Sequence, residues 1–220
     1  MKIVCVIPAY NEAKNIAKVV ANVRPTVDEV IVVDDCSRDN TFNLAAATGA
    51  TVLHHPINRG QGAALQTGND YALKNGADII VHFDADDQFL ATEIKDMVAP
   101  IIRGEAEIVF GSRFLGKKAN LPAMKRYLIL PLAKAFNRVF FGIKLSDGQN
   151  GFRALSRHAA EIIKIANREM AHASEIQAKA FKAKLKITEV PVTVIYHHFG
   201  QKFSGGLKVI NDLLTHKIIK

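Results

Sequence analysis

The stretch Asp78–Gln88, with the sequence DIIVHFDADDQ, joins a short apolar run to a cluster of polar side chains. Residues 78–83 are rich in β-branched and aromatic side chains, which is typical of a buried strand. In an α/β fold, ligands bind at the carboxyl edge of the sheet, where Asp84, Asp86 and Gln88 would lie. Their oxygen atoms suit Mg²⁺ or Mn²⁺ shared with substrate phosphates. An Asp-rich turn or helix cap would explain the same residues without a metal.

Strand patterns alternate with helical patterns on both sides of this stretch. We predict strands at residues 2–7, 30–34, 51–54, 78–83 and 108–111, and helices at residues 12–23, 39–47, 62–73 and 92–102. This order favours a mostly parallel sheet with helices on both faces. Farther along, we predict helices at residues 124–141 (divided in two by Pro131), 155–165, 174–183 and 207–219, and a strand at residues 187–195 whose Pro191 favours an edge position.

The composition is that of a globular α/β domain with a sizeable core. The chain has 220 residues, of which 49% are hydrophobic and 23% charged, and no repeat or low-complexity linker divides it. We therefore expect a single domain, residues 1–220. Cys5 and Cys36 lack the spacing of a disulfide framework or a metal site, which predicts buried thiols in a reducing cytoplasm. We expect no signal peptide, because no small-residue cleavage site follows the apolar start, and no apolar stretch approaches the roughly 18 residues that span a bilayer.

The positive charge is concentrated in one segment. The formal net charge is +8; Ile108–Ser146 holds eight basic and no acidic residues, and the other 21 basic residues match the 21 acidic ones. Within this segment, residues 117–144 place cations beside Leu and Phe, which predicts cationic amphipathic helices on an anionic membrane surface. The alternative is that the apolar residues pack on the sheet and the cations form a solvated face.

Three further polar loops follow predicted strands. After the first strand, Tyr10 offers a ring face to a nucleobase and Glu12 offers hydrogen-bond acceptors. After the second, one of the two carboxylates Asp34 and Asp35 could bind a base N–H or a ribose hydroxyl. After the third, residues 58–63 (NRGQGA) contain glycines that permit close approach to a phosphate at a helix N-terminus. Helix caps would account for the first two loops taken alone, and the glycine motif alone is not specific.

Taken together and in this order, the motifs resemble the family 2 glycosyltransferases, most of all the polyprenyl-phosphate sugar transferases of the dolichyl-phosphate mannose synthase type. The resemblance covers residues 3 to about 204. It rests on Pro8-Ala9-Tyr10-Asn11-Glu12, Val33-Asp34-Asp35-Cys36-Ser37 with Asp39 and Thr41, Asn58 to Gly62, Asp84-Ala85-Asp86 with Gln88, Gly111-Ser112-Arg113, and Asp147 with Gly151-Phe152-Arg153. It implies a GT-A (Rossmann-like) fold and a nucleotide-sugar donor.

The resemblance also implies roles for individual residues. The nucleoside and the rest of the donor would be bound by Pro8, Ala9, Tyr10, Glu12, Asp35, Asp84 and Ala85. The metal would be bound by Asp84, Asp86 and Gln88, and the phosphates would meet Arg113 and Arg153. Where the family has Arg followed by Gly-x-Ser-Lys, this chain has residues 196–205, in which the candidates for a cationic grip are Lys202, His197 and His198.

Sugar transfer requires stabilisation of the charge on the leaving diphosphate, which we assign to a metal at Asp84 and Asp86 and to Arg113. A hydroxyl acceptor would also need a general base, whereas a lipid monophosphate is largely ionised at neutral pH. Asp147 is the candidate base or acceptor-site residue, and a turn at residues 146–148 is its alternative explanation.

We therefore expect an inverting, metal-dependent hexosyltransferase that uses a donor of the GDP-mannose or UDP-glucose type. Its acceptor would be polyprenyl or dolichyl phosphate at the cytoplasmic face of a membrane, where a membrane-anchoring protein is a further candidate partner. The main alternative is a family 2 enzyme with a soluble or polysaccharide hydroxyl acceptor. A nucleic-acid-binding protein would show a recognisable motif, and a nucleotidyltransferase a glycine-rich first loop. The intact carboxylate set argues against a non-catalytic relative.

Overall fold

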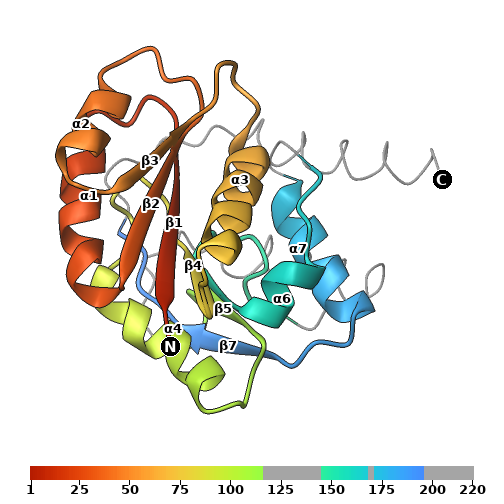
Figure 1. The fold of residues 1–220 in the computed structure, drawn as a ribbon. Coiled ribbons are helices and arrows are strands. Elements are labelled where there is room, and N and C mark those ends of the chain that lie inside the picture. The colour runs from red at the N-terminus through yellow and green to blue at the C-terminus, as the bar shows by residue number, and fades with distance from the viewer. Residues whose placement is uncertain (116–144, 168–170, 196–220) are drawn as a thin grey trace, which may run out of the picture.

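The computed structural model describes residues 1–115, 145–167 and 171–195, which build a seven-stranded sheet flanked by helices (Figure 1). The strands are β1 (Ile3–Ala9), β2 (Glu29–Asp34), β3 (Thr51–His54), β4 (Ile79–His82), β5 (Ile108–Ser112), β6 (Arg153–Ser156) and β7 (Ile187–Pro191). The helices are α1 (Ile16–Val23), α2 (Thr41–Ala47), α3 (Gln61–Lys74), α4 (Ile94–Ile102), α6 (Arg157–Ile162) and α7 (His172–Lys182), with 3₁₀ turns η1 (Arg24–Thr26) and η2 (Ala91–Glu93).

The strand order is β3-β2-β1-β4-β6-β5-β7. Neighbouring strands are parallel except where β6 pairs with β4 and β5. The mostly parallel sheet expected from the sequence is therefore confirmed. Because β1, β2, β4 and β5 run in one direction, their carboxyl ends and the loops that follow them lie at one edge.

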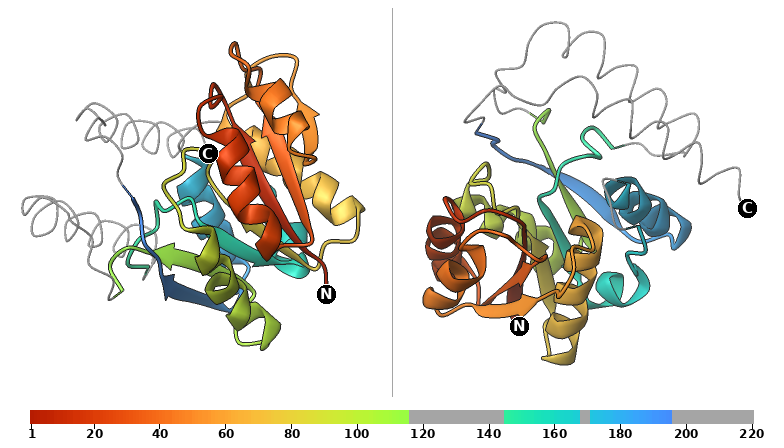
Figure 2. Two further views of the ribbon diagram at one scale, coloured as in Figure 1. Left: turned by 90° about the vertical axis from the view of Figure 1, so that its left-hand side faces the viewer. Right: turned by 90° about the horizontal axis from the view of Figure 1, so that it is seen from above.

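Each face of the sheet has its own apolar core. The helices α1, α2 and α4 cover one face, and α3, α6 and α7 cover the other (Figures 1 and 2). Successive residues of a strand point to opposite faces, so β1 contributes Cys5 and Ile7 to the first core and Val4 and Val6 to the second. Cys5 is a buried free thiol, as expected, whereas the free thiol Cys36 is partly exposed.

The strand β6 corrects one expectation: its last two residues, Leu155 and Ser156, were predicted to begin a helix at residues 155–165. Ala154 lies between Val81 of β4 and Val109 of β5, and α6 begins only at Arg157. A segment of four residues carries little periodic signal, so pairing with two neighbours decides its conformation. Ser156 then accepts a hydrogen bond from the Ala159 N–H at 3.1 Å, which caps α6.

The strand β7 lies at the edge of the sheet, as its proline predicts, and ends at Pro191 rather than at residue 195. The chain then runs beside the loop that follows β4. Val194 forms a β-bridge with Phe89, and the Ile195 N–H donates to the Gln88 carbonyl at 2.8 Å. The last described residues therefore contact the loop that carries the predicted metal ligands Asp84, Asp86 and Gln88.

The predicted helices at residues 124–141 and 207–219, and the cationic segment 117–144, lie outside the described residues. No helix in the part of the chain that the structure describes has both the length and the apolar character to cross a bilayer.

Candidate functional site

The loop after β1 is tied to the loop after β2. Asn11 has a φ of 56°; its N–H donates to the Ser37 hydroxyl at 2.9 Å, and its Oδ1 accepts from the Arg38 N–H at 2.8 Å. Tyr10 precedes this turn, where Pro8–Ala9 ends β1, and is 43% exposed. An exposed aromatic ring at the carboxyl edge is available to stack on a planar ligand.

Three carboxylates from the ends of β1 and β4 influence one another at this edge: Glu12, Asp84 and Asp86. Burial and then the charge of Asp86 raise the pKa of Asp84 to about 6. Burial also raises the pKa of Glu12, against a hydrogen bond from Asn15, and the charge of Asp86 adds to this rise. Carboxylates that repel one another in this way are stabilised by a cation.

The chemistry of the cluster fits a divalent metal. Asp84 and Asp86 supply hard oxygen ligands, and a cation between them would offset their repulsion. Among the described residues, no three His, Cys, Asp or Glu side chains are grouped to hold a metal alone. Part of the coordination would therefore come from substrate phosphates and water, as is usual for Mg²⁺. Gln88, the third predicted ligand, donates its backbone N–H to Asp86 Oδ1 at 3.2 Å.

Two residues to which we assigned no role from the sequence determine the position of the Asp84 carboxylate. Gln61, the first residue of α3, donates Nε2 to Asp84 Oδ1 at 3.0 Å. On the other side, a Cβ at Gly151 would come within 2.2 Å of Asp84 Oδ2, so only glycine leaves the carboxylate in place. Both residues belong to glycine-containing motifs that the sequence displays, and these motifs are the signal that could have identified them.

Asp35 lies beneath the loop that joins β3 to α3 and is only 3% exposed. Its Oδ1 accepts from the Arg59 N–H at 2.8 Å, its Oδ2 accepts from the Gly60 N–H at 2.7 Å, and His55 Nδ1 lies 2.7 Å from Oδ1. The carboxylate thus holds a loop at the edge of the site. Contact of Asp35 with a nucleoside stays a prediction.

Arg113 and Asp147 form an ion pair. Arg113 Nε donates to Asp147 Oδ2 at 2.6 Å, Nη2 donates to Oδ1 at 2.7 Å, and the Arg113 N–H donates to Oδ2 at 3.1 Å. Asn150 Nδ2 adds a fourth hydrogen bond at 3.4 Å, and Asp147 is 4% exposed. Arg113 and Asn150 together fix the position of the Asp147 carboxylate.

Glu189 on β7 supports the turn that carries Asp147. Its carboxylate accepts from the Ser146 N–H at 2.8 Å, from the Ser146 hydroxyl at 2.7 Å and from the Asp147 N–H at 3.1 Å. These partners lie more than 40 residues away in the sequence, and no local motif marks Glu189, which is why sequence reasoning missed it.

Most of the site residues described above lie in a part of the chain that matches a known family. The model for glycosyl transferase family 2 matches residues 4–163, which is more than half of the chain. The chain belongs to this family. The matched span contains the carboxylate cluster, the Arg113–Asp147 pair and β6, so the resemblance seen in the sequence is confirmed.

Curated relatives and solved structures agree with this membership. UDP-N-acetylglucosamine–dolichyl-phosphate N-acetylglucosaminyltransferase of Methanococcus voltae is 33% identical over 98% of this chain and 96% of the relative. Undecaprenyl-phosphate mannosyltransferase of Micrococcus luteus is 28% identical, over 94% and 89% of the two chains. Glucosyl-3-phosphoglycerate synthase from Mycobacterium tuberculosis, in complex with Mn²⁺, UDP-glucose and phosphoglyceric acid, has a TM-score of 0.75 at 24% identity, covering 97% of this chain and 79% of that one. The structural likeness confirms the GT-A fold.

Arg153, which the family 2 motifs place near phosphates, is 1% exposed within β6. Its guanidinium carbon lies 6.0 Å from the centre of the Phe110 ring, and no guanidinium nitrogen has a hydrogen-bond partner among the described residues. Burial lowers the pKa of Arg153 to about 10, although the charges of Asp84 and Asp147 oppose this effect. Arg153 is thus a buried positive charge near both carboxylates, and its contact with a phosphate stays a prediction.

Lys202, like His197 and His198, lies outside the described residues. Its predicted contact with the donor therefore stays a prediction.

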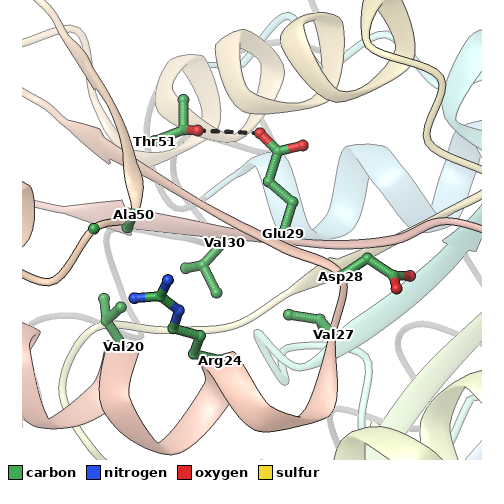
Figure 3. Close-up of a pocket in the computed structure, with 9 residues that line it drawn as sticks. Val20, Arg24, Val27, Asp28, Glu29, Val30, Ala50 and Thr51 are labelled. Atoms are coloured by element: carbon green, nitrogen blue, oxygen red, sulfur yellow. Dashed lines mark hydrogen bonds between the residues drawn. The ribbon is translucent and has the colours of Figure 1, made fainter.

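A pocket of about 210 Å³ lies at the opposite edge of the sheet, at the amino ends of β2 and β3 (Figure 3). Polar side chains that line it already have partners. Arg24 donates to the Thr48 carbonyl at 2.7 Å, and Glu29 accepts from the Thr51 hydroxyl at 3.1 Å. We do not assign this pocket to the family 2 reaction, because the carboxylate cluster lies at the other edge.

Proposed function

We propose that this glycosyltransferase moves a hexose from a nucleotide-diphosphate donor, of the GDP-mannose or UDP-glucose type, to a polyprenyl or dolichyl phosphate. The relatives from Methanococcus voltae and Micrococcus luteus, which match nearly the whole chain, are named for dolichyl-phosphate and undecaprenyl-phosphate acceptors. The observation that carries the donor side is the cluster of Glu12, Asp84 and Asp86 at the carboxyl ends of β1 and β4.

In this proposal, Mg²⁺ or Mn²⁺ is held by Asp84, Asp86 and Gln88. A bound divalent metal acts as a Lewis acid that stabilises negative charge on the departing diphosphate. Gln61 fixes the orientation of Asp84 through the hydrogen bond to Oδ1. The exposed Tyr10 ring would stack on the nucleobase.

The hydrogen bonds to Asp147 support a phosphate acceptor. In the transfer, the bond from the anomeric carbon to the donor phosphate oxygen breaks, and a bond to an acceptor oxygen forms on the opposite face, which inverts the configuration. A hydroxyl acceptor must lose a proton to a base, but Asp147 already accepts three hydrogen bonds from Arg113 and one from Asn150. A phosphate monoester, with its second pKa near 6, needs no such base.

The acceptor would place the enzyme on the cytoplasmic face of a membrane, as a peripheral protein. Residues 117–144 are our proposed contact with the lipid surface, because their excess of cations beside Leu and Phe suits anionic headgroups. A membrane-anchoring partner protein would be needed only if this segment is insufficient.

The direct test is a donor screen with the full chain. Undecaprenyl phosphate would be incubated with UDP-sugars and GDP-sugars in Mn²⁺, in Mg²⁺ or in EDTA, and the lipid product would be identified by mass spectrometry. We expect a glycosylated lipid phosphate with one donor class, only when a metal is present. Determination of the product's anomeric configuration by NMR tests inversion.

A parallel reaction with a soluble alcohol distinguishes the two acceptor classes. Product from the alcohol, with none from the lipid phosphate, would contradict the proposed acceptor while leaving the family assignment intact. An unchanged rate in EDTA would contradict the proposed metal.

A further inference from the structure

An exposed loop at the edge of the site is anchored from below by buried side chains. Residues 56–59 are exposed, but His55, which precedes them, is 4% exposed and Asp35 beneath them is 3% exposed. The Arg59 and Gly60 N–H groups both donate to the Asp35 carboxylate, at 2.8 and 2.7 Å. The Asn58 side chain adds a hydrogen bond from Nδ2 to the Asp35 carbonyl at 3.2 Å, so Asp35 holds the loop mainly through the loop's backbone.

His55 links this carboxylate to α3. Its Nδ1 lies 2.7 Å from Asp35 Oδ1, and its Nε2 lies 2.9 Å from the Thr67 hydroxyl. A carboxylate oxygen can only accept, so Nδ1 carries a proton, while the Thr67 hydroxyl, which can donate or accept, pairs with Nε2. Both ring nitrogens are thus used, and the ring cannot rotate without losing both hydrogen bonds.

The same loop connects Asp35 to Asp84, a proposed metal ligand. Gly60 has a φ of 87°, a conformation that glycine adopts readily, and its carbonyl accepts from the Ala63 and Ala64 N–H groups at 3.0 and 3.1 Å. Gly60 therefore both binds Asp35 and starts α3. The next residue, Gln61, donates to Asp84 Oδ1 at 3.0 Å. A continuous series of contacts thus runs from His55 to a proposed metal ligand.

We propose that His55 is a positioning residue for donor binding, an inference that rests on the proposed function. His55 would act through Asp35, which fixes the backbone of residues 59–60 and, through Gln61, the orientation of Asp84. The ligand class served by this contact is a nucleoside diphosphate with its divalent metal. Neither His55 nor Thr67 would touch the donor itself.

The test compares His55→Leu, which removes both hydrogen bonds, with His55→Asn, whose amide can still donate to Asp35. His158→Leu is the matched control, because His158 Nδ1 makes a similar contact with Glu107, at 2.7 Å, beyond the amino end of β5. UDP and GDP, each with Mn²⁺, would be titrated by calorimetry, and exchange of the Arg59 and Gly60 amide hydrogens would be followed by NMR.

For His55→Leu we expect roughly tenfold weaker binding of the preferred nucleotide and at least about tenfold faster exchange of both amides, because the carboxylate that holds them loses its anchor. His55→Asn should return both quantities to within about threefold of wild type, and His158→Leu should change neither. Rescue by Asn is the result that a general loss of stability would not produce.

If His55→Leu does not fold, Thr67→Val, which removes the hydroxyl at similar size, gives the decisive comparison, with a smaller change in the same direction. Unchanged nucleotide affinity in the folded variants overturns the inference, even where exchange is faster. If the wild type binds neither UDP nor GDP, the proposed donor is wrong. In that case unchanged amide exchange would also overturn the positioning role, and faster exchange rescued by Asn would support it.

Discussion

At the residue scale, Asp84 is where the contacts of the site converge. Gln61 donates to one of its oxygens, the absence of a side chain at Gly151 leaves room for the other, and Asp86 lies close enough to raise its pKa. Keeping such a carboxylate ionised costs the folded protein stability unless a cation is bound. Asp84 is therefore a residue whose environment favours binding at the expense of stability.

This cost predicts a pH dependence that Asp84→Asn should remove. The pKa of Asp84 rises from 3.8 to about 6 on folding, so between these values the folded protein holds a proton that the unfolded chain releases. Stability from this group is therefore lost as the pH rises from about 4 to 6 and is constant above. In EDTA, we expect the stability of Asp84→Asn relative to wild type to improve by about 2 kcal/mol between pH 4 and pH 7, since Asp84 retains some solvent contact.

Urea denaturation of the two proteins at each pH measures this difference, in which shared groups that do not interact with Asp84 cancel. A stability difference that is the same at pH 4 and pH 7 would show that the folded-state pKa of Asp84 is not raised.

Asp86→Asn should reduce sugar transfer by about a hundredfold or more, because a metal would lose one of its two carboxylate ligands. We expect little change in thermal stability, since the substitution relieves the repulsion between Asp86 and Asp84. Asp87→Asn is the matched control, because Asp87 lies in the same loop but pairs with Lys18 at 2.6 Å. Initial rates and thermal melts of the two variants and the wild type measure both effects. Near-normal turnover of Asp86→Asn would argue against the metal assignment.

At the scale of elements, β5, the turn at residues 146–148 and β7 form one unit. Glu189 of β7 holds the backbone of the turn, and the turn presents Asp147 to Arg113, which follows β5. The neighbouring strands β5 and β7 pair in parallel over five residues, and this pairing fixes the backbone that carries Glu189. The alignment of the Arg113–Asp147 pair therefore depends on an edge strand.

Glu189→Gln tests this dependence. An amide offers one accepting oxygen and turns its NH₂ group toward the N–H donors of the turn, so we expect about tenfold lower kcat and about 1–2 kcal/mol lower stability. Nucleotide affinity should fall less than kcat, because Glu189 acts on the donor phosphates only through Asp147 and Arg113. Glu105→Gln, which breaks an exposed ion pair with Arg103, is the control. Full kcat in Glu189→Gln would leave the turn independent of β7.

At the scale of the whole molecule, the uneven charge predicts membrane binding. Each Lys or Arg near an anionic surface contributes about 1 kcal/mol, so reversing Lys125, Arg126 and Lys134 to Glu should release the protein from anionic vesicles. The same variant should lose more transfer to a long-chain lipid phosphate than to a short analogue. Flotation of the purified chain with vesicles at low and high salt measures the binding and shows whether an anchoring partner is required.

A matched variant separates local charge from net charge. Lys74, Lys95 and Lys182 are exposed on described helices outside the cationic segment, and their reversal to Glu gives the same formal net charge as the first variant. We expect this control to float with the vesicles like wild type. Equal release of both variants would mean that only net charge matters, and failure of the wild type to float at low salt would favour a soluble acceptor.

The first five strands were predictable to within one or two residues, because β-branched runs buried on both faces give a strong local signal. The start of α1 was less predictable. The predicted helix begins at residue 12, whereas α1 begins at Ile16. The turn before α1 gives its backbone donors to distant side chains, such as the Glu12 N–H to the hydroxyl of Thr41, the first residue of α2, at 2.8 Å. Helix periodicity does not record such contacts.

The sequence alone determined the class of this protein: an α/β sheet with acidic, glycine-containing loops at strand ends, in the order that marks family 2 glycosyltransferases. Those properties depend on periodicity and local residue type, which short segments encode. Only the tertiary structure decided that β6 is an antiparallel strand, that Arg153 is buried, and that Arg113 pairs with Asp147. It also showed that Asp35, which we expected at the nucleoside, holds a loop with His55. These facts depend on which distant groups meet in space, because a buried polar group must find its hydrogen-bond partner wherever the fold places one.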